Sequence, residues 1–186
     1  MKYFQYAAFG KLPIVPEFIK VHLKTVEFIE LELWYRKAYQ HFVNKYGVES
    51  KKYFINMQPY HFIYANKNKS SSMLGTVFSG SDSNGRHYPF VLSKLLTDQI
   101  DQQFLTSVPI LNRDYFEKSE QFINKSWGNQ HIKSIENEIE QIMLDISCKK
   151  KTSDLEKVLQ ELKQFDLSEY KKSDDLSYLL QYFKTL

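Results

Sequence analysis

The sequence predicts an α/β protein: a layered sandwich with a mostly antiparallel or mixed sheet flanked by helices, and a further helical layer at the C-terminal end. Three observations lead to this class. A chain of 186 residues with 42% hydrophobic side chains can bury a core. Short aromatic and β-branched runs gather in the first half, around one long helical pattern. In the second half, apolar residues recur at helical spacings of three and four.

Four short runs are typical of strands because they are aromatic or β-branched and are bounded by glycine, proline or polar linkers. They are expected near residues 3–9, 60–65, 73–79 and 87–93. Asn84-Gly85 lies between the last two runs and suits the positive φ of a tight turn, which predicts an antiparallel hairpin. Pro89 lacks a backbone donor, which favours an edge strand or a bulge.

The most regular helical pattern of the first half spans residues 25–46. Thr25 is a candidate N-cap, and Gly47 marks the end of the helix. Trp34 lies next to the apolar stripe, so we expect it to pack in the core.

The last third of the sequence has patterns typical of helices. Asp114 and Glu117 have the spacing of a capping box at the start of a helix that reaches Trp127. Five isoleucines then follow a rhythm that places them on one helical face: Ile132, Ile135, Ile139, Ile142 and Ile146. Further helices are expected after Ser153 and around Leu176. We therefore expect an α/β core over residues 1–110 and a C-terminal helical region over 111–186 that packs on it within one structural domain.

Charge and composition argue against several classes of protein. The net charge of +3 is small and interspersed, which gives little reason to expect a nucleic-acid partner. The first residues do not have the pattern of a secretory signal, and no apolar stretch of about 18 residues occurs. We therefore expect a cytoplasmic protein without membrane insertion. The single cysteine, Cys148, excludes an internal disulfide and a four-thiolate zinc site.

Catalytic and cofactor motifs are missing from the sequence. Gly10-Lys11 does not form a P-loop, because the pattern would need glycine in place of Gln5 and Ser or Thr in place of Leu12. The five histidines show no metal-ligand spacing, so we expect neither a metal nor a cofactor. The serines between residues 70 and 83 do not occur in a G-x-S-x-G pattern, so no catalytic residue is predicted.

The segment GSDSNGRHYPF at residues 80–90 concentrates charge at a predicted turn. Arg86 can place its guanidinium on Asp82 or on carbonyls of the neighbouring loop, which would fix the turn. Alternatively, Lys11, Asp82 and Arg86 lie together at one sheet edge and present a charged surface to a partner, with Tyr88 as an aromatic anchor.

A third hypothesis makes this corner the site of a small enzyme or ligand-binding protein. Its candidates would be Asp82, Gly85, Arg86 and His87. That hypothesis requires a deep pocket lined by these side chains.

Two stretches carry a resemblance to a known family. FGKLP at residues 9–13, followed by Phe18, and GTVFSGSDSNGRHYPF at 75–90 resemble the signatures of TagF, a type VI secretion-associated accessory protein. That family has a GKLP-x-x-GDF opening, a helix with W-D-x-W, and a strand–turn–strand reading roughly G-V-L-x-P-S-x-D-x-x-G-R-x-F-P-L. The residues in register with the last pattern are Gly75, Asp82, Gly85, Arg86 and Pro89.

The resemblance spans roughly residues 4–95 and includes departures. Pro16-Glu17 stands where the family usually has Gly-Asp, Gly80 where serine is common, and Glu32 and Trp34 alone remain of W-D-x-W. The resemblance implies a bacterial, cytoplasmic negative regulator of type VI secretion. Such a protein would bind and sequester the FHA-domain scaffold protein of the system, without catalysis. Lys11, Asp82, Gly85, Arg86, Tyr88 and Pro89 would then form a partner-binding or structural corner.

Overall fold

The computed structural model describes residues 5–65, 72–96, 112–125, 127 and 131–144, all within a compact unit spanning residues 1–148. Five strands form one sheet: β1 (Tyr6–Gly10), β2 (Ile19–Val21), β3 (Tyr60–Ala65), β4 (Ser72–Phe78) and β5 (Phe90–Leu96). Their order is β2-β1-β5-β4-β3, and every neighbouring pair is antiparallel. The predicted layered α/β class is confirmed.

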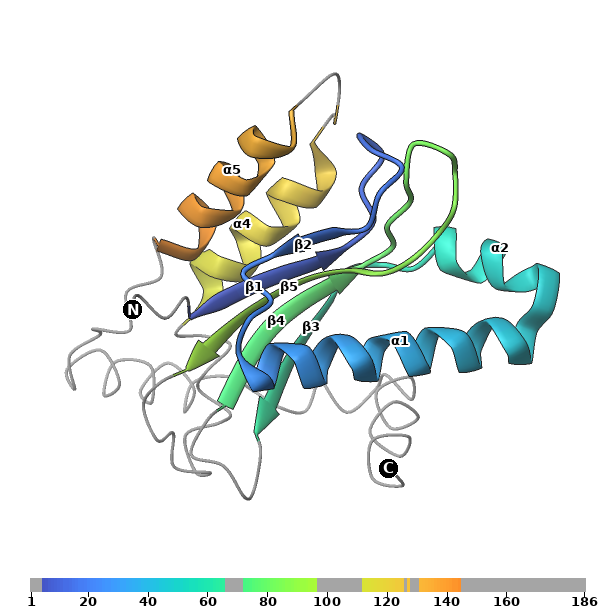
Figure 1. Cartoon of the computed structure of the whole chain (residues 1–186), viewed down its shortest axis with the longest axis horizontal. Helices are drawn as coiled ribbons and strands as arrows, with labels where there is room; N and C mark the ends of the chain where they lie inside the picture. Colours follow the sequence, from blue (N-terminus) through green and yellow to red (C-terminus); the bar gives the residue numbers. More distant parts are fainter. Residues whose placement is uncertain (1–4, 66–71, 97–111, 126, 128–130, 145–186) are drawn as a thin grey trace, which may run out of the picture. The chain divides into compact units, whose positions relative to one another are not determined.

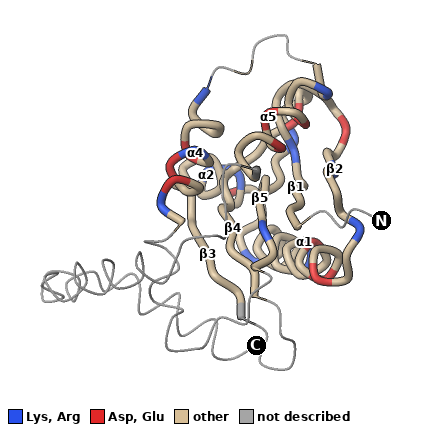
Figure 2. The backbone as a smooth tube through the Cα atoms, turned by 90° about the vertical axis from the view of Figure 1, so that its left-hand side faces the viewer, with Lys and Arg blue, Asp and Glu red and all other residues tan. Residues whose placement is uncertain are grey.

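Helices cover both faces of the sheet (Figures 1 and 2). The covering helices are α1 (Val26–Tyr46), α4 (Arg113–Asn124) and α5 (Ile132–Leu144). Side chains of β1 alternate between the two faces, as strand geometry requires. Ala7 and Phe9 pack with α1, whereas Tyr6 and Ala8 belong to the apolar cluster that includes α4 and α5. None of the described helices is long and apolar enough to cross a membrane.

Helix α1 has the predicted bounds but not the predicted burial. It follows Thr25, whose hydroxyl makes no capping hydrogen bond within the described residues, and ends at Gly47, with a φ of 54°. Trp34 is 39% exposed, so its expected place in the core is wrong. Residues Phe28 and Leu31 point to the sheet, while Trp34 lies on the flank of the helix and contacts Tyr35 edge-on.

Three short elements were not predicted: β2, the 3₁₀ turn η1 (Gly47–Glu49) and α2 (Ser50–Ile55). With three to six residues each, they are too short for apolar periodicity to identify them. In Figure 1, α1 runs past the ends of the strands, and α2 returns beside it toward the sheet.

The predicted hairpin of β4 and β5 is present, with Phe78 opposite Phe90. Its connection is longer than a two-residue turn and contains an isolated bridge between Ser81 and His87. The edge position expected from Pro89 is wrong, because β5 is the central strand. Pro89 immediately precedes the strand, where its missing N–H removes no ladder hydrogen bond.

Two of the helices predicted for the last third are present as α4 and α5, but both ends of α4 differ: it ends at Asn124, so the predicted extension to Trp127 is wrong. Asn112, rather than Asp114, occupies its N-cap position, so the capping box is wrong. Glu117 instead accepts a hydrogen bond from Arg113 at 2.6 Å. Three of the isoleucines in α5 are buried: Ile135, Ile139 and Ile142.

Several expectations fall outside the described residues. These are Ile146, the helices after Ser153 and around Leu176, and the domain boundary near residue 110. The division into a core at 1–110 and a helical region at 111–186 stays a prediction.

Candidate functional site

The corner begins where two stretches of backbone approach closely. Gly10 ends β1 with a φ of 134°, and a Cβ added there would lie 2.6 Å from the Cα of Phe90 and still closer to the carbonyl oxygen of Pro89. A Cβ on Gly80 would lie 2.6 Å from the carbonyl oxygen of Tyr88, and closer still to that of Lys11. These contacts leave no room for a side chain, so glycine is required at both positions.

A tight turn follows Gly80. The Gly85 amide donates to the carbonyl oxygen of Asp82 at 2.9 Å, and the Asp82 amide donates to Arg86 O at 3.0 Å. Gly85 has the positive φ, 73°, that the turn needs. Oδ1 of Asp82 accepts hydrogen bonds from the amides of Asn84 at 3.0 Å and Arg86 at 2.8 Å. The aspartate therefore holds the backbone of its own turn.

The second carboxylate oxygen of Asp82, together with Arg86 and Ser83, joins this turn to the segment that follows β1. Oδ2 accepts hydrogen bonds from Nζ of Lys11 and from Nε of Arg86, the latter at 2.7 Å. Nη2 of Arg86 donates to Pro16 O at 2.7 Å, and the amide of Ser83 donates to the carbonyl oxygen of Val15. The guanidinium thus contacts both of the partners that the sequence suggested for it, the Asp82 carboxylate and a loop carbonyl.

The Asp82 carboxylate is fully occupied and shielded. Its four hydrogen bonds fill its acceptor positions, and its side chain is 0% exposed. Burial alone would raise the pKa of Asp82, but the hydrogen bonds from Lys11 and Arg86 outweigh it, so the pKa lies well below its usual range. The group is a permanent anion at neutral pH.

Tyr88 faces α1 rather than open solvent. Its ring contacts Phe18 and Tyr39 edge-on, with centroid distances of 5.0 and 5.1 Å. Burial, with a smaller effect of the Glu32 charge, raises the pKa of Tyr88 to about 12. The hydroxyl of Tyr39 donates to the carbonyl oxygen of His87 at 2.8 Å. These contacts attach the end of the corner loop to α1.

The structure therefore brings Lys11, Asp82, Gly85 and Arg86 together, whereas the side chain of His87 packs on a different element. The imidazole of His87 packs against Phe54 of α2, at 5.8 Å between ring centroids. Burial and then the positive charge of Lys51 lower the pKa of His87. Within the described residues, no hydrogen bond joins His87 to Asp82, and no group of His, Cys, Asp and Glu side chains could hold a metal ion.

Glu32 is a buried acid whose place beside the corner the sequence did not predict. It is 3% exposed and accepts hydrogen bonds from Arg36, one turn further along α1. Its charge acts on Tyr88. The only sequence signal for Glu32 was that it stands where the W-D-x-W pattern of the family has its aspartate.

A polar chain that the sequence analysis missed joins β3, β4 and α4. Nδ1 of His61 lies 3.0 Å from Oγ1 of Thr76, and Nε2 lies 2.8 Å from Oε1 of Glu120. A hydrolytic triad has the same order of hydroxyl, imidazole and carboxylate, but with the two ring nitrogens exchanged. Because Thr76 is 0% exposed, however, a substrate could not reach its hydroxyl. The three groups instead connect an edge strand to its neighbour and to a helix.

His61→Ala is expected to lower the free energy of unfolding by about 1–2 kcal/mol, because it removes both hydrogen bonds and leaves the buried Thr76 hydroxyl with fewer partners. Urea denaturation measures the change. His41→Ala, at an exposed position of α1, is the matched control and should cost less. Equal losses in the two variants would refute the connecting role of His61.

The antiparallel sheet, its two helical faces and the corner together define a layered α/β domain. The profile of the TagF N-terminal domain family, described as type VI secretion system-associated, matches residues 7–142. The chain therefore belongs to this family, as its two signature stretches predicted. A search of curated proteins found no match.

Among solved structures, the chain is similar to PA0076 from Pseudomonas aeruginosa PAO1, with a TM-score of 0.62 and 18% sequence identity. The similarity covers 74% of this chain and 62% of PA0076, so the chain spans less than two thirds of that protein. At this identity the similarity concerns the fold alone.

Proposed function

We propose that this protein is a non-catalytic, post-translational repressor of type VI secretion system assembly or firing. It acts in the cytoplasm by binding and sequestering a component of the machine, such as its FHA-domain scaffold protein. The observation that carries this proposal is the TagF N-terminal domain match over residues 7–142.

The geometry of the corner argues against a catalytic role for Asp82. With all its acceptor positions occupied, the Asp82 carboxylate is not available as a general base or nucleophile. Lys11, Asp82 and Gly85 act as the internal support of the corner. The Arg86 side chain is 61% exposed and stands at the surface of the turn. The alternative of an enzyme at this corner would need the opposite arrangement: an accessible carboxylate.

Deleting the gene is expected to raise type VI secretion several-fold in a bacterium that carries this chain and an active system, because a stoichiometric inhibitor is lost. Secreted substrates in the culture supernatant are measured, and complementation with the wild-type gene should restore repression. In parallel, calorimetry with the purified FHA-domain scaffold protein measures direct binding. Unchanged secretion together with no binding would overturn the proposal.

A further inference from the structure

The last residue of α1 and the segment that follows it expose large apolar side chains. Val48 is 96% exposed, Ile55 53%, Tyr53 51% and Tyr46 39%. Within such a short segment, this is an unusual concentration of apolar surface, and such patches mark interaction sites. The α2 surface is defined here as Tyr46, Val48, Lys51, Lys52, Tyr53, Ile55 and Asn56.

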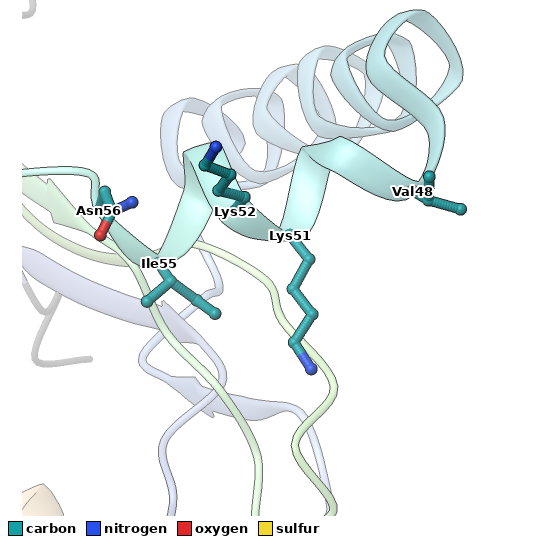
Figure 3. Close-up of a pocket in the computed structure, with 5 residues that line it drawn as sticks. All are labelled: Val48, Lys51, Lys52, Ile55 and Asn56. Carbon is teal, nitrogen blue, oxygen red and sulfur yellow. The ribbon is translucent and has the colours of Figure 1, made fainter.

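A shallow hollow of about 380 Å³ lies on the α2 surface (Figure 3). Val48, Lys51, Lys52, Ile55 and Asn56 line it. The positions 48, 51, 52 and 55 recur at helical spacing, so they share one side of the η1–α2 segment. In Figure 3 the two lysines leave the helix in different directions. The lining of the hollow thus includes two apolar side chains and two lysines whose ammonium groups point apart.

The two lysines of this surface outnumber Glu49, the acid of the η1–α2 segment. Among the described residues, neither Lys51 nor Lys52 forms an ion pair with an acidic side chain. Lys51 lies close enough to the corner loop for its charge to act on His87. A ligand of this surface should therefore carry negative charge.

The α2 surface also has a firm support. Phe54, on the inner side of α2, is 4% exposed and contacts Tyr39 with a centroid distance of 5.4 Å. Tyr39 in turn contacts Tyr88 of the corner loop. Tyr46 and Tyr53 contact each other at 5.2 Å. Aromatic packing thus fixes the segment before any partner arrives, which lowers the entropic cost of binding.

We propose that the α2 surface docks an acidic segment of a partner protein. Carboxylates of that segment pair with Lys51 and Lys52, while one of its apolar side chains enters the hollow between Val48 and Ile55. The identity of the partner rests on the proposed function; the chemistry of the segment rests on the α2 surface alone.

Two other occupants fit less well. A two-fold pair of identical α2 surfaces would bring lysines against lysines. Two lysines on a six-residue helix contribute only about 1 kcal/mol each at an anionic membrane, less than stable attachment needs. An acidic protein segment that also carries an apolar side chain complements both the lysines and the apolar residues Val48 and Ile55.

The test compares Lys51→Glu/Lys52→Glu with a control of equal charge change, Lys24→Glu/Lys133→Glu, at exposed positions outside the α2 surface. Calorimetry with the purified FHA-domain scaffold protein should show a Kd about tenfold weaker or more for the first variant and nearly unchanged for the second. Thermal melts verify that both variants are folded. Equal binding by the two variants would overturn the docking surface while leaving the proposed function intact.

A second probe separates the docking surface from the identity of the partner. This probe is a synthetic helical peptide with leucines on one face and glutamates on both flanks, titrated into the labelled protein and followed by NMR. Shifts that cluster at the α2 surface and vanish in the Lys51→Glu/Lys52→Glu variant support the inference, even if the scaffold protein does not bind. Shifts elsewhere, no shifts, or lysine-dependent binding to phosphatidylglycerol vesicles instead of the peptide would refute it.

Discussion

Gly10→Ala is expected to lower the free energy of unfolding by about 3–5 kcal/mol, one of the largest losses for a single methyl group in this chain. Gly10 has a φ of 134°, which side-chain-bearing residues rarely adopt. The added Cβ would also meet backbone atoms of Pro89 and Phe90, which cannot rotate away as a side chain would. Relief requires β1 and the corner loop to separate, which disturbs the ion pair of Lys11 with Asp82.

Chemical denaturation measures this loss, and Gly47→Ala is the control. Gly47 also has a positive φ, 54°, but a Cβ there would meet nothing within 4 Å. Its ψ of −130° lies outside the left-handed helical region, so Gly47→Ala should cost about 1–3 kcal/mol, the backbone contribution alone. Similar losses in both variants would mean that the close approach of the two backbones is not needed for stability.

Local chemistry made much of the fold predictable. The four longer strands carry aromatic and β-branched side chains, and their alternation follows from strand geometry. The helix of residues 26–46 has a regular apolar stripe and a glycine at its end. The turn at the corner was predictable because Asp82, Asn84 and Gly85 are close in sequence and are residue types typical of turns.

Contacts between distant segments were harder to predict. Lys11 and Asp82 are 71 positions apart; the sequence placed them together only as one alternative, and the fold shows that the ammonium reaches the carboxylate. His61 and Glu120 meet because α4 packs near β3 and β4, which no periodicity reports. Trp34 was misplaced for a similar reason, since its exposure depends on which flank of α1 meets the sheet. In each case tertiary packing decides what the local pattern leaves open.

Asp82→Asn is expected to lower the melting temperature by about 10 °C at neutral pH. The substitution conserves shape but replaces an acceptor oxygen by an NH₂ group, which faces the donors of Lys11 or Arg86. Arg86→Ala should cost less, because the guanidinium is 61% exposed and Lys11 still pairs with the carboxylate. Differential scanning calorimetry measures both, and Asp114→Asn, at an exposed aspartate, is the control.

The pH dependence of stability gives this prediction a second readout. The folded pKa of Asp82 lies below its usual range, so the unfolded chain takes up the proton first as the pH falls. The stabilisation is complete above the unfolded pKa of about 3.9 and is lost as the pH falls below it toward the folded value. Between about pH 5 and pH 2, the wild-type melting temperature should therefore fall more steeply than that of Asp82→Asn. Parallel curves for the two proteins would show that the carboxylate makes no net contribution to the stability of the corner.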